Sequence, residues 1–313
     1  MTDLKPKVIV IAGPTASGKS ALASAIAREF TGTVINADSQ QCYADLPILT
    51  ARPTAAEMAA IPHRLFGDLG PLVKDAAPAW AKRAANAITA ASFAGSPPIV
   101  VGGTGLYLQA LMDGMPAMPP IDPAVRDAAR ALLDEIGHAA LHTRLAERDP
   151  LIAARLKVGD TQRLLRAWEV VEGTGRPLSA WQQDDPCRPV VADYHAVLLM
   201  PPRDETVAAG DARFDAMLAG GALDEVAALV GSGVPADAPV MRVLGARPLA
   251  RHLAGETDLE GAVTLAKTAT RQYAKRQATW FRNQLFANST YFTKYSESLC
   301  DEVFSKIRCF LLT

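Results

Sequence analysis

Cysteine is scarce in this chain, and long apolar runs are missing from it. The 313 residues include four cysteines, none in a CxxC pair and none with a histidine at a metal-ligand spacing. This pattern argues against a zinc site or a disulfide framework and is typical of a reducing cytosol. No stretch approaches the roughly 18 apolar residues of a transmembrane helix, and the opening MTDLKPKVIV has no signal-peptide pattern. We therefore expect a cytoplasmic protein with no membrane contact.

An excess of charge of one sign is also missing. Lysine and arginine together number 32, against 33 aspartates and glutamates, so the net charge is −1. This balance excludes a protein that is basic over its whole surface, but it permits one local basic face. Apolar residues make up 49% of the chain, which is enough for a substantial core. Nothing in the sequence requires more than a monomer.

The stretch GPTASGKS at 13–20 matches the phosphate-binding pattern G-x-x-x-x-G-K-[ST]. A β-branched run at 8–12 precedes it, and apolar residues at helical spacing follow it. In this context backbone N–H groups and the start of the helix face one anion, Lys19 adds charge, and Ser20 offers a hydroxyl to Mg²⁺. A plain glycine-rich turn is the alternative. The predicted diphosphate-binding residues are Gly13, Pro14, Thr15, Ala16, Ser17, Gly18, Lys19 and Ser20.

Strands and helices alternate over the first hundred residues. Strands are expected at 33–37 and 98–101, with a helix at 76–93 between them. This order predicts an α/β fold with a P-loop NTPase-like parallel sheet. The predicted parts are the first part of the core at 1–117, a helical insertion at 118–190, a second core part with basic helices at 191–287, and a tail of unassigned role at 288–313.

Two polar turns are expected beside the P-loop, because ligands of such sheets lie beyond the carboxyl ends of the strands. Asp38 follows the strand at 33–37, and a carboxylate there can accept a proton or bind Mg²⁺. A helix N-cap is its plain structural alternative. The turn Gly102–Gly103–Thr104–Gly105 brings a hydroxyl and lets a ligand approach the backbone closely, or is only a turn.

A basic stretch at 267–282 contains no acid. Lys267, Arg271 and Lys275 recur every four residues and share one helix face, with aromatic residues interleaved. Such a face fits a nucleic-acid backbone, although a solvated helix face is the commoner case. Further polar and basic positions that favour one extended anionic partner are Gln162, Arg163, Arg166, Arg203, Arg213, Arg242 and Arg247.

Taken in order, these motifs resemble the tRNA dimethylallyltransferases, also called tRNA isopentenyltransferases, over roughly residues 7–286. The matching pieces are GPTASGKS at 13–20, NADSQQ at 36–41, the arginine and proline of TARP at 50–53, VGGTGLYLQAL at 101–111, DPAVR at 122–126, DTQRLLRAWEV at 160–170, RFDAMLAGGALDEV at 213–226, RVLGAR at 242–247 and TRQYAKRQATWFR at 270–282.

The resemblance implies transfer of a dimethylallyl group from dimethylallyl diphosphate to a tRNA anticodon stem-loop. The acceptor is N6 of the adenosine just 3′ of the anticodon, in tRNAs reading codons that begin with U. The P-loop then holds the prenyl diphosphate rather than ATP, with Mg²⁺ at Ser20. The implied catalytic residues are Asp38, Thr104, Arg213 and Lys19. The implied tRNA-binding residues are Asp38, Ser39, Gln40, Gln41, Thr104, Arg126, Gln162, Arg163, Arg166, Arg242, Arg247, Arg271, Lys275 and Arg276.

Three other functions share part of this pattern. A P-loop small-molecule kinase needs the same loop and Mg²⁺, but not the basic stretch. An adenylate isopentenyltransferase performs the same chemistry on free AMP, ADP or ATP, but needs no large insertion. A non-catalytic nucleotide-binding module that grips RNA would not need Asp38. Which tRNAs are modified, and whether the product is modified further, are not encoded in these motifs.

Overall fold

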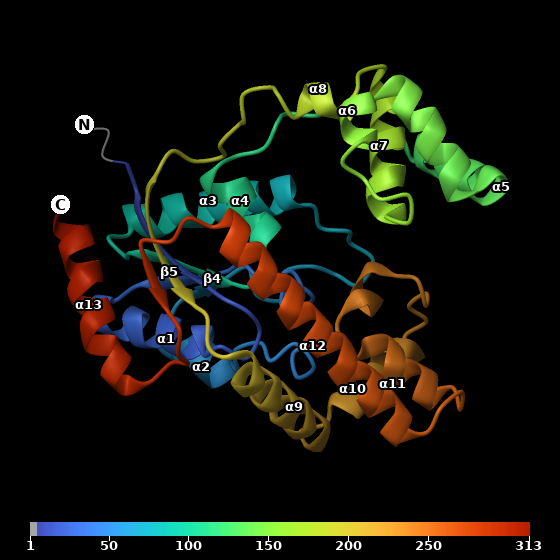
Figure 1. Cartoon of the computed structure of the whole chain (residues 1–313). Coiled ribbons are helices and arrows are strands. Elements are labelled where there is room, and N and C mark those ends of the chain that lie inside the picture. The colour runs from blue at the N-terminus through green and yellow to red at the C-terminus, as the bar shows by residue number, and fades with distance from the viewer. Residues whose placement is uncertain (1–4) are drawn as a thin grey trace. The chain divides into compact units, whose positions relative to one another are not determined.

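The computed structural model of the chain describes residues 5–313 and divides into two compact units (Figure 1). One unit contains the residues up to Met112 together with Pro189–Thr313, and the other is Asp113–Arg188. The second of these units corresponds to the helical insertion that the sequence predicts at 118–190. Among the described residues, no helix combines the length and apolar composition needed to cross a bilayer.

A six-stranded parallel sheet organises the larger unit. The strands are β1 (Lys7–Ala12), β2 (Thr33–Asn36), β3 (His63–Arg64), β4 (Pro98–Gly102), β5 (Asp193–Leu199) and β6 (Ser289–Tyr291). Their order is β3-β2-β4-β1-β5-β6, and every neighbouring pair is parallel. This arrangement confirms the predicted α/β fold with a parallel sheet. The P-loop follows the central strand β1, so it lies at the edge where parallel strands end and ligands bind.

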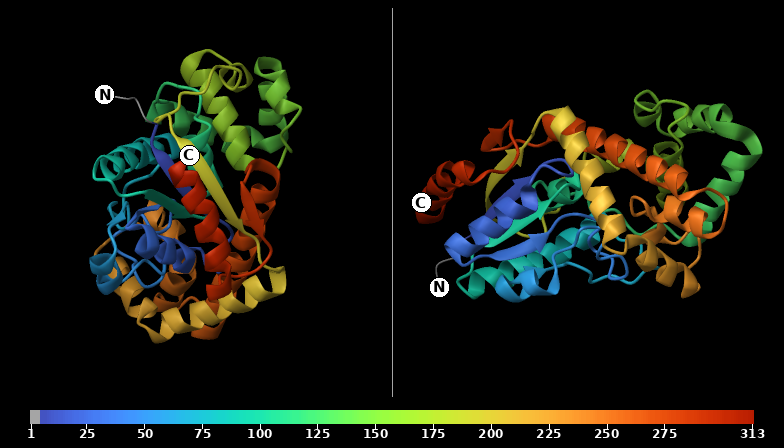
Figure 2. Two further views of the ribbon diagram at one scale, coloured as in Figure 1. Left: turned by 90° about the vertical axis from the view of Figure 1, so that its left-hand side faces the viewer. Right: turned by 90° about the horizontal axis from the view of Figure 1, so that it is seen from below.

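Helices cover both faces of this sheet (Figures 1 and 2). The helices of the first part are α1 (Lys19–Phe30), α2 (Ala55–Ala60), α3 (Ala77–Phe93) and α4 (Gly105–Met112). Alternate residues of β1 point to opposite faces, and those including Ile9 and Ile11 pack with Leu22 and Ile26 of α1. The expected strands and helices of this half are present, with ends shifted by a residue or so.

The last 25 residues contribute to the core of the larger unit, although no sequence motif assigns them a role. β6 extends the sheet beside β5, and α13 (Glu297–Leu312) packs along α1 (Figure 2). Val303 and Ile307 are fully buried in the cluster beneath α1. Lys7 donates to the carbonyls of Phe310 and Leu311 at 2.9 and 3.1 Å, a favourable place for a cation at a helix end.

Four helices and a short 3-10 turn follow β5. They are α9 (Arg203–Ala219), α10 (Ala222–Gly231), η1 (Pro239–Arg242), α11 (Ala246–Leu253) and α12 (Leu259–Gln284). Their apolar faces form a second core cluster that includes Phe214, Val226 and Leu249. Leu46 and Leu49, from the segment after β2, are buried in the same cluster. This cluster fixes α9 and α12 beside the strand ends.

The smaller unit is mainly helical, as its apolar spacing predicts, with one isolated antiparallel bridge between Met115 and Cys187. Its helices are α5 (Pro123–Arg148), α6 (Pro150–Ala153), α7 (Thr161–Thr174) and α8 (Leu178–Trp181). Leu133, Leu141 and Leu145 pack with Leu164 of α7 in its core. The buried Asp149 accepts hydrogen bonds from the backbone of Ile152 and Ser179, which caps α6 and ties it to α8.

Candidate active site

The P-loop keeps its shape through contacts with distant backbone as well as through its glycines. Gly18 has a φ of 88°, and a Cβ there would come within 2.6 Å of Tyr295 in the carboxyl-terminal segment. A Cβ on Gly13 would come within 2.4 Å of the carbonyl oxygen of Leu199, at the end of β5. Both glycines are therefore required by the close approach of neighbouring protein as well as by the turn itself.

Lys19 is the buried cation of this loop. Its Nζ donates to the carbonyl of Pro14 at 2.6 Å. Burial lowers the pKa of Lys19 to about 8, while Asp38 acts to raise it and Arg213 to lower it further. A lysine held in this state is short of compensating negative charge, and a diphosphate would supply that charge.

Residues from six regions of the chain line one cleft in the larger unit. These regions are the P-loop, the segment after β2, the end of β4, helix α9, the turn before α11 and helix α12. The lining residues are Thr15, Lys19, Ser20, Asp38, Gln40, Gln41, Leu49, Thr50, Val101, Gly102, Gly210, Arg213, Phe214, Met217, Leu244, Thr270 and Tyr273. The cleft thus joins a polar phosphate end to an apolar wall.

Asp38 is held by its own local turn at the end of β2. Its N–H donates to Oδ1 of the buried Asn36 at 2.8 Å, and its Oδ1 accepts from the N–H of Gln40 at 3.0 Å. Asn36 in turn donates to the carbonyls of Asp38 and Leu65, both at 3.0 Å. The amide of Asn36 therefore fixes the backbone on both sides of the carboxylate. Asp38 is not the N-cap of a helix, which was the structural alternative.

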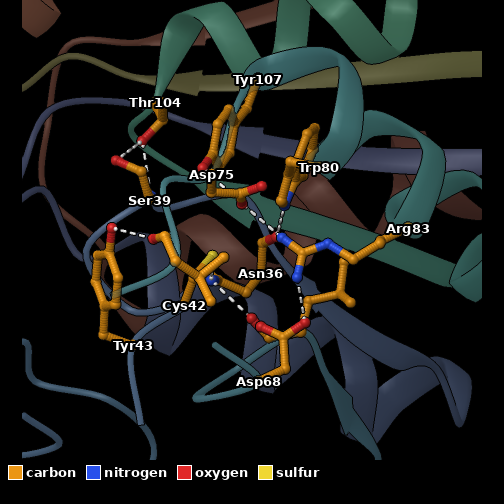
Figure 3. A network of polar contacts seen from close by, with 12 residues as sticks. Asn36, Ser39, Cys42, Tyr43, Asp68, Asp75, Trp80, Arg83, Thr104 and Tyr107 are labelled. Carbon is orange, nitrogen blue, oxygen red and sulfur yellow. Dashed lines mark hydrogen bonds and ion pairs between the residues drawn. The ribbon is translucent and has the colours of Figure 1, made fainter. Parts of the chain in front are cut away.

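A partly buried polar network adjoins this turn through Asn36 (Figure 3). Arg83 of α3 bridges Asp68 and Asp75 at 2.6 and 2.5 Å. Tyr107 of α4 donates to Asp75 at 2.9 Å and stacks on Trp80, whose indole N–H reaches the carbonyl of Asn36 at 2.9 Å. Because these groups satisfy one another, the position of Asn36 and hence of Asp38 is tightly defined.

Thr104 joins the second polar turn to the first. Its Oγ1 accepts from the N–H of Ser39 at 2.9 Å and its hydroxyl donates to Oγ of Ser39 at 3.2 Å, as Figure 3 shows. The hydroxyl of Tyr273 also lies close to the side chains of Thr104 and Gln40. Burial raises the pKa of Tyr273 to about 12, so this phenol stays protonated at neutral pH.

The glycines at 102–105 serve a different purpose from the one that the sequence suggests. We expected them to admit a ligand to the backbone, but protein atoms occupy the space of their missing side chains. A Cβ on Gly102 would meet Ala37 at 2.1 Å, one on Gly103 would meet Gln277 at 2.2 Å, and one on Gly105 would meet Trp280 at 2.2 Å. The turn is packed between β2 and α12, and Gly102 still lines the cleft.

Arg213 reaches the P-loop from α9. Its Nη2 makes a short hydrogen bond to Oγ1 of Thr15. Burial lowers the pKa of Arg213, and Asp38 partly opposes that shift. Lys19, Asp38 and Arg213 thus come together from three separate elements, with two cations and one carboxylate around the same space. Arg203, the other arginine that the sequence pairs with it, lies at the start of α9.

The basic face of α12 is partly neutralised by α9. Lys267 pairs with Asp215 at 2.7 Å, and Arg271 forms a short ion pair with Asp211. Lys275 and Arg276, nearer the cleft end of the helix, are exposed. The regular spacing correctly places the cations on a helix, but it gives no sign that two of them face acids of a neighbouring helix.

The remaining predicted tRNA-binding residues are divided between the two units. In the larger unit, Arg242 and Arg247 are exposed on either side of Leu244, whose N–H donates to the side chain of Gln40 at 2.8 Å. The other four lie in the helical unit. Arg126 is exposed on α5, and Gln162, Arg163 and Arg166 line a hollow over Ile152, Leu156 and Leu178.

Sequence reasoning missed several residues that shape the cleft. Gln277 of α12 contacts both the P-loop and the glycine turn, and Leu49, Phe214 and Met217 form the apolar wall. A sequence pattern does indicate the position of Gln277. Tyr273, Gln277 and Trp280 are spaced four and three residues apart and so share a helix face. No local pattern points to the wall, because its residues are separated by long stretches of chain.

The donor set at the phosphate end fits a magnesium ion that is carried in with a diphosphate. Ser20 is exposed and lines the cleft, which leaves its hydroxyl free to act as a ligand. Within residues 5–313, no group of three or more His, Cys, Asp and Glu side chains could hold a metal on its own. Mg²⁺ commonly keeps several waters and takes its other oxygens from substrate phosphates, so a single protein hydroxyl suits it.

Comparison with known proteins gives a consistent result. Residues 41–284 match the model of the family described as IPP transferase. A tRNA dimethylallyltransferase of Paramagnetospirillum magneticum is 51% identical over 313 residues, covering 100% of this chain and 99% of its own. A tRNA isopentenylpyrophosphate transferase of Bacillus halodurans has a similar structure, with a TM-score of 0.70, 31% identity, and coverage of 98% of this chain and 97% of its own. A eukaryotic dimethylallyltransferase solved acting on tRNA has a TM-score of 0.76 and 29% identity, covering 91% and 74%.

Proposed function

This chain belongs to the IPP transferase family, and from that premise we propose that it is a tRNA dimethylallyltransferase. It transfers a dimethylallyl group from dimethylallyl diphosphate to N6 of the adenosine just 3′ of the anticodon, in tRNAs that read codons beginning with U. The observation that carries this proposal is the meeting of Lys19, Asp38 and Arg213 at one cleft, with cations at the phosphate end and a single carboxylate beside them.

The donor lies with its diphosphate on the P-loop. The allylic carbon–oxygen bond breaks, and the bonding electrons leave with the diphosphate. Lys19, Arg213 and the backbone N–H groups of the loop stabilise the charge that develops on this leaving group. Thr104 is hydrogen-bonded to Ser39, the neighbour of Asp38 in the chain, and we assign it a contact near the breaking bond. Ser20 would hold Mg²⁺ at this end of the cleft, and the ion would supply Lewis-acid stabilisation of the same charge.

Asp38 acts on the acceptor. The N6 amine attacks the allylic carbon, and a proton from N6 passes to a carboxylate oxygen of Asp38. An exocyclic amine is a weak nucleophile, so its position matters as much as the base. The turn built by Asn36 and Gln40 holds the carboxylate for this purpose. The adenine must leave its stack to reach the cleft, which makes base extrusion part of the proposal.

The tRNA is held by polar groups of both units. In the larger unit these are the segment Asp38–Gln41, Thr104, the exposed arginines at 242 and 247, and Arg271, Lys275 and Arg276. In the helical unit they are Arg126, Gln162, Arg163 and Arg166. Because the substrate is a cytoplasmic RNA and the cleft is built by one chain, the proposal includes a cytoplasmic monomer. The kinase alternative is less well supported, since β4 ends in glycines without the metal-binding acid usual at that place.

Substitution of Asp38 tests the assigned chemistry. Asp38→Ala removes the proton acceptor but leaves the P-loop intact, so we expect kcat to fall by about 10³-fold while dimethylallyl diphosphate binding changes less than about threefold. Asp301→Ala, an exposed carboxylate on α13, is the matched control and should behave as wild type. A kcat for Asp38→Ala above a tenth of the wild-type value would remove Asp38 from the mechanism.

A further inference from the structure

The side chain of Gln277 spans the two loops that line the catalytic cleft. Its Oε1 accepts from the N–H of Thr15 in the P-loop at 2.8 Å, and its Nε2 donates to the carbonyl of Gly103 at 2.9 Å. Only 5% of the residue is exposed. One buried amide therefore satisfies a donor of one loop and an acceptor of the other, and these loops are 88 residues apart in sequence.

Each of the two bonded residues adjoins a group that the reaction uses. Thr15 receives the hydrogen bond of Arg213 on its hydroxyl, so the Thr15 backbone sets where that guanidinium lies. Gly103 directly precedes Thr104, whose hydroxyl fixes Ser39 beside Asp38. A change in the spacing of the two loops would therefore change the distance between the diphosphate end and the carboxylate end of the cleft.

Packing around Gln277 leaves room for that side chain and little else. The space where Gly103 would carry a Cβ lies 2.2 Å from Nε2 of Gln277. One turn away on either side, Tyr273 lies close to Thr104 and Trp280 covers Gly105. Three successive turns of α12 thus contact the glycine turn, and Gln277 is the one among the three with a hydrogen bond to the P-loop.

We propose that Gln277 is a positioning residue that sets the spacing between the diphosphate-binding loop and the turn carrying Thr104. This inference rests on the proposed transferase function. Its physical basis is that buried amides left without partners are costly, so loss of the side chain would force both loops to move to recover hydrogen bonds. Displacements of about 1 Å from the reactive geometry can cost about 10²-fold in rate.

Gln277→Met tests the proposal directly, because methionine has nearly the same shape and makes neither hydrogen bond. We expect kcat to fall about 10-fold and KM for dimethylallyl diphosphate to rise about 10-fold, from the loss of two buried hydrogen bonds. KM for tRNA should rise less than KM for the donor, since the exposed cations of α12 and the arginines of the helical unit are untouched. The matched control is Gln284→Met on the exposed end of the same helix, which should behave as wild type.

Two results of this assay would overturn the proposal. One is a variant whose kcat and donor KM both stay within about twofold of wild type. The other is a defect confined to KM for tRNA, which would place Gln277 in RNA binding. Inactive wild-type protein would instead contradict the proposed function itself, so the two failures are distinguishable.

A double-mutant cycle with Gly103 gives a second test that does not depend on the folding of Gln277→Met. Gly103→Ala places a methyl group against Nε2 of Gln277 and should lower kcat/KM for the donor about 10-fold. In a Gln277→Ala background the space beside Gly103 is empty. There, Gly103→Ala should lower kcat/KM for the donor by less than about a further twofold. Effects that simply multiply would show that the two residues act independently and would contradict the proposal.

Discussion

The P-loop and helix α12 both line the catalytic cleft, but their contacts differ in how far they reach along the chain. In the P-loop, Lys19 bonds the carbonyl of Pro14, five residues away, and the motif is complete within eight residues. In α12, Gln277 bonds groups 174 and 262 residues away. The residues that define the first region form one local motif, although Gln277 and Arg213 also bond it from far along the chain, whereas the second gains its role from what it touches.

This difference explains why the two faces of α12 have separate functions. The inner face, with Tyr273, Gln277 and Trp280, is directed at the turn 102–105 and fixes catalytic loops. The outer face carries the cations, two of which pair with α9. A single basic, aromatic-rich sequence therefore contains one surface that packs against the loops of the cleft and another that we propose contacts tRNA.

The largest expected effect comes from the locally built region. Lys19→Met removes the buried cation that faces the diphosphate, and we expect kcat/KM for the donor to fall by about 10³-fold or more, a loss of about 4 kcal/mol. Steady-state kinetics with varied dimethylallyl diphosphate measure it, with Lys5→Met, an exposed lysine before β1, as the control. A loss below about 10-fold would show that the P-loop backbone alone binds the donor.

A core substitution tests whether the P-loop is as independent as its motif suggests. Ile307→Ala in α13 leaves a cavity beneath α1, the helix that begins in the P-loop, and should lower the free energy of unfolding by about 2–5 kcal/mol. Chemical denaturation measures the change. Leu312→Ala on the same helix, at 82% exposure, should stay within about 0.5 kcal/mol of wild type. Equal effects of the two variants would mean that the carboxyl-terminal segment is not part of the core.

Charge removal on α12 sharpens the contrast between its two faces. Replacing Lys275 and Arg276 by alanine should raise KM for tRNA about 10-fold and leave KM for the donor unchanged. The slope of log binding constant for tRNA against log salt concentration should become shallower by about one to two. Arg271→Ala should have a weaker effect, because Arg271 is already paired with Asp211. Filter binding at several salt concentrations compares the tRNA affinities of the double variant and of Arg271→Ala. A stronger effect from Arg271→Ala would show that tRNA displaces Asp211.

The smallest expected effect is a pH dependence of donor binding. With the pKa of Lys19 at about 8 in the free site, its charge is fully present below that pH and is lost as the pH rises through it. Affinity for dimethylallyl diphosphate should therefore weaken a few-fold between pH 7.5 and about 8.5, with uptake of a proton on binding. Calorimetry in buffers of different ionisation enthalpy measures that uptake. Binding that strengthens over this range would contradict the assigned state of Lys19.

Much of the fold follows from the sequence, because its strands are continuous apolar runs and its P-loop is a local motif. Asp38 could also be placed, since it follows a strand of the same parallel sheet, although β4 separates that strand from the P-loop strand β1. Gln277 could not, because its two hydrogen bonds depend on how α12 packs across the sheet edge. The ion pairs of Lys267 and Arg271 with α9 were hidden for the same reason.

The short edge strands also lie beyond local reasoning. β3 contains only His63 and Arg64, and β6 only Ser289–Tyr291. Runs of two and three residues carry no alternation that a sequence pattern can detect, and they are strands only because a longer neighbour pairs with them. Composition set the carboxyl-terminal segment apart from the rest of the chain, although its burial makes it part of the same core.

A transfer assay tests the central claim most directly. Purified protein is incubated with Mg²⁺, labelled dimethylallyl diphosphate and either unmodified tRNA that carries adenosine 3′ of the anticodon or free AMP. The account predicts label in that tRNA, at N6 of that adenosine, and none in AMP. Label in AMP alone, or in neither acceptor, would contradict it.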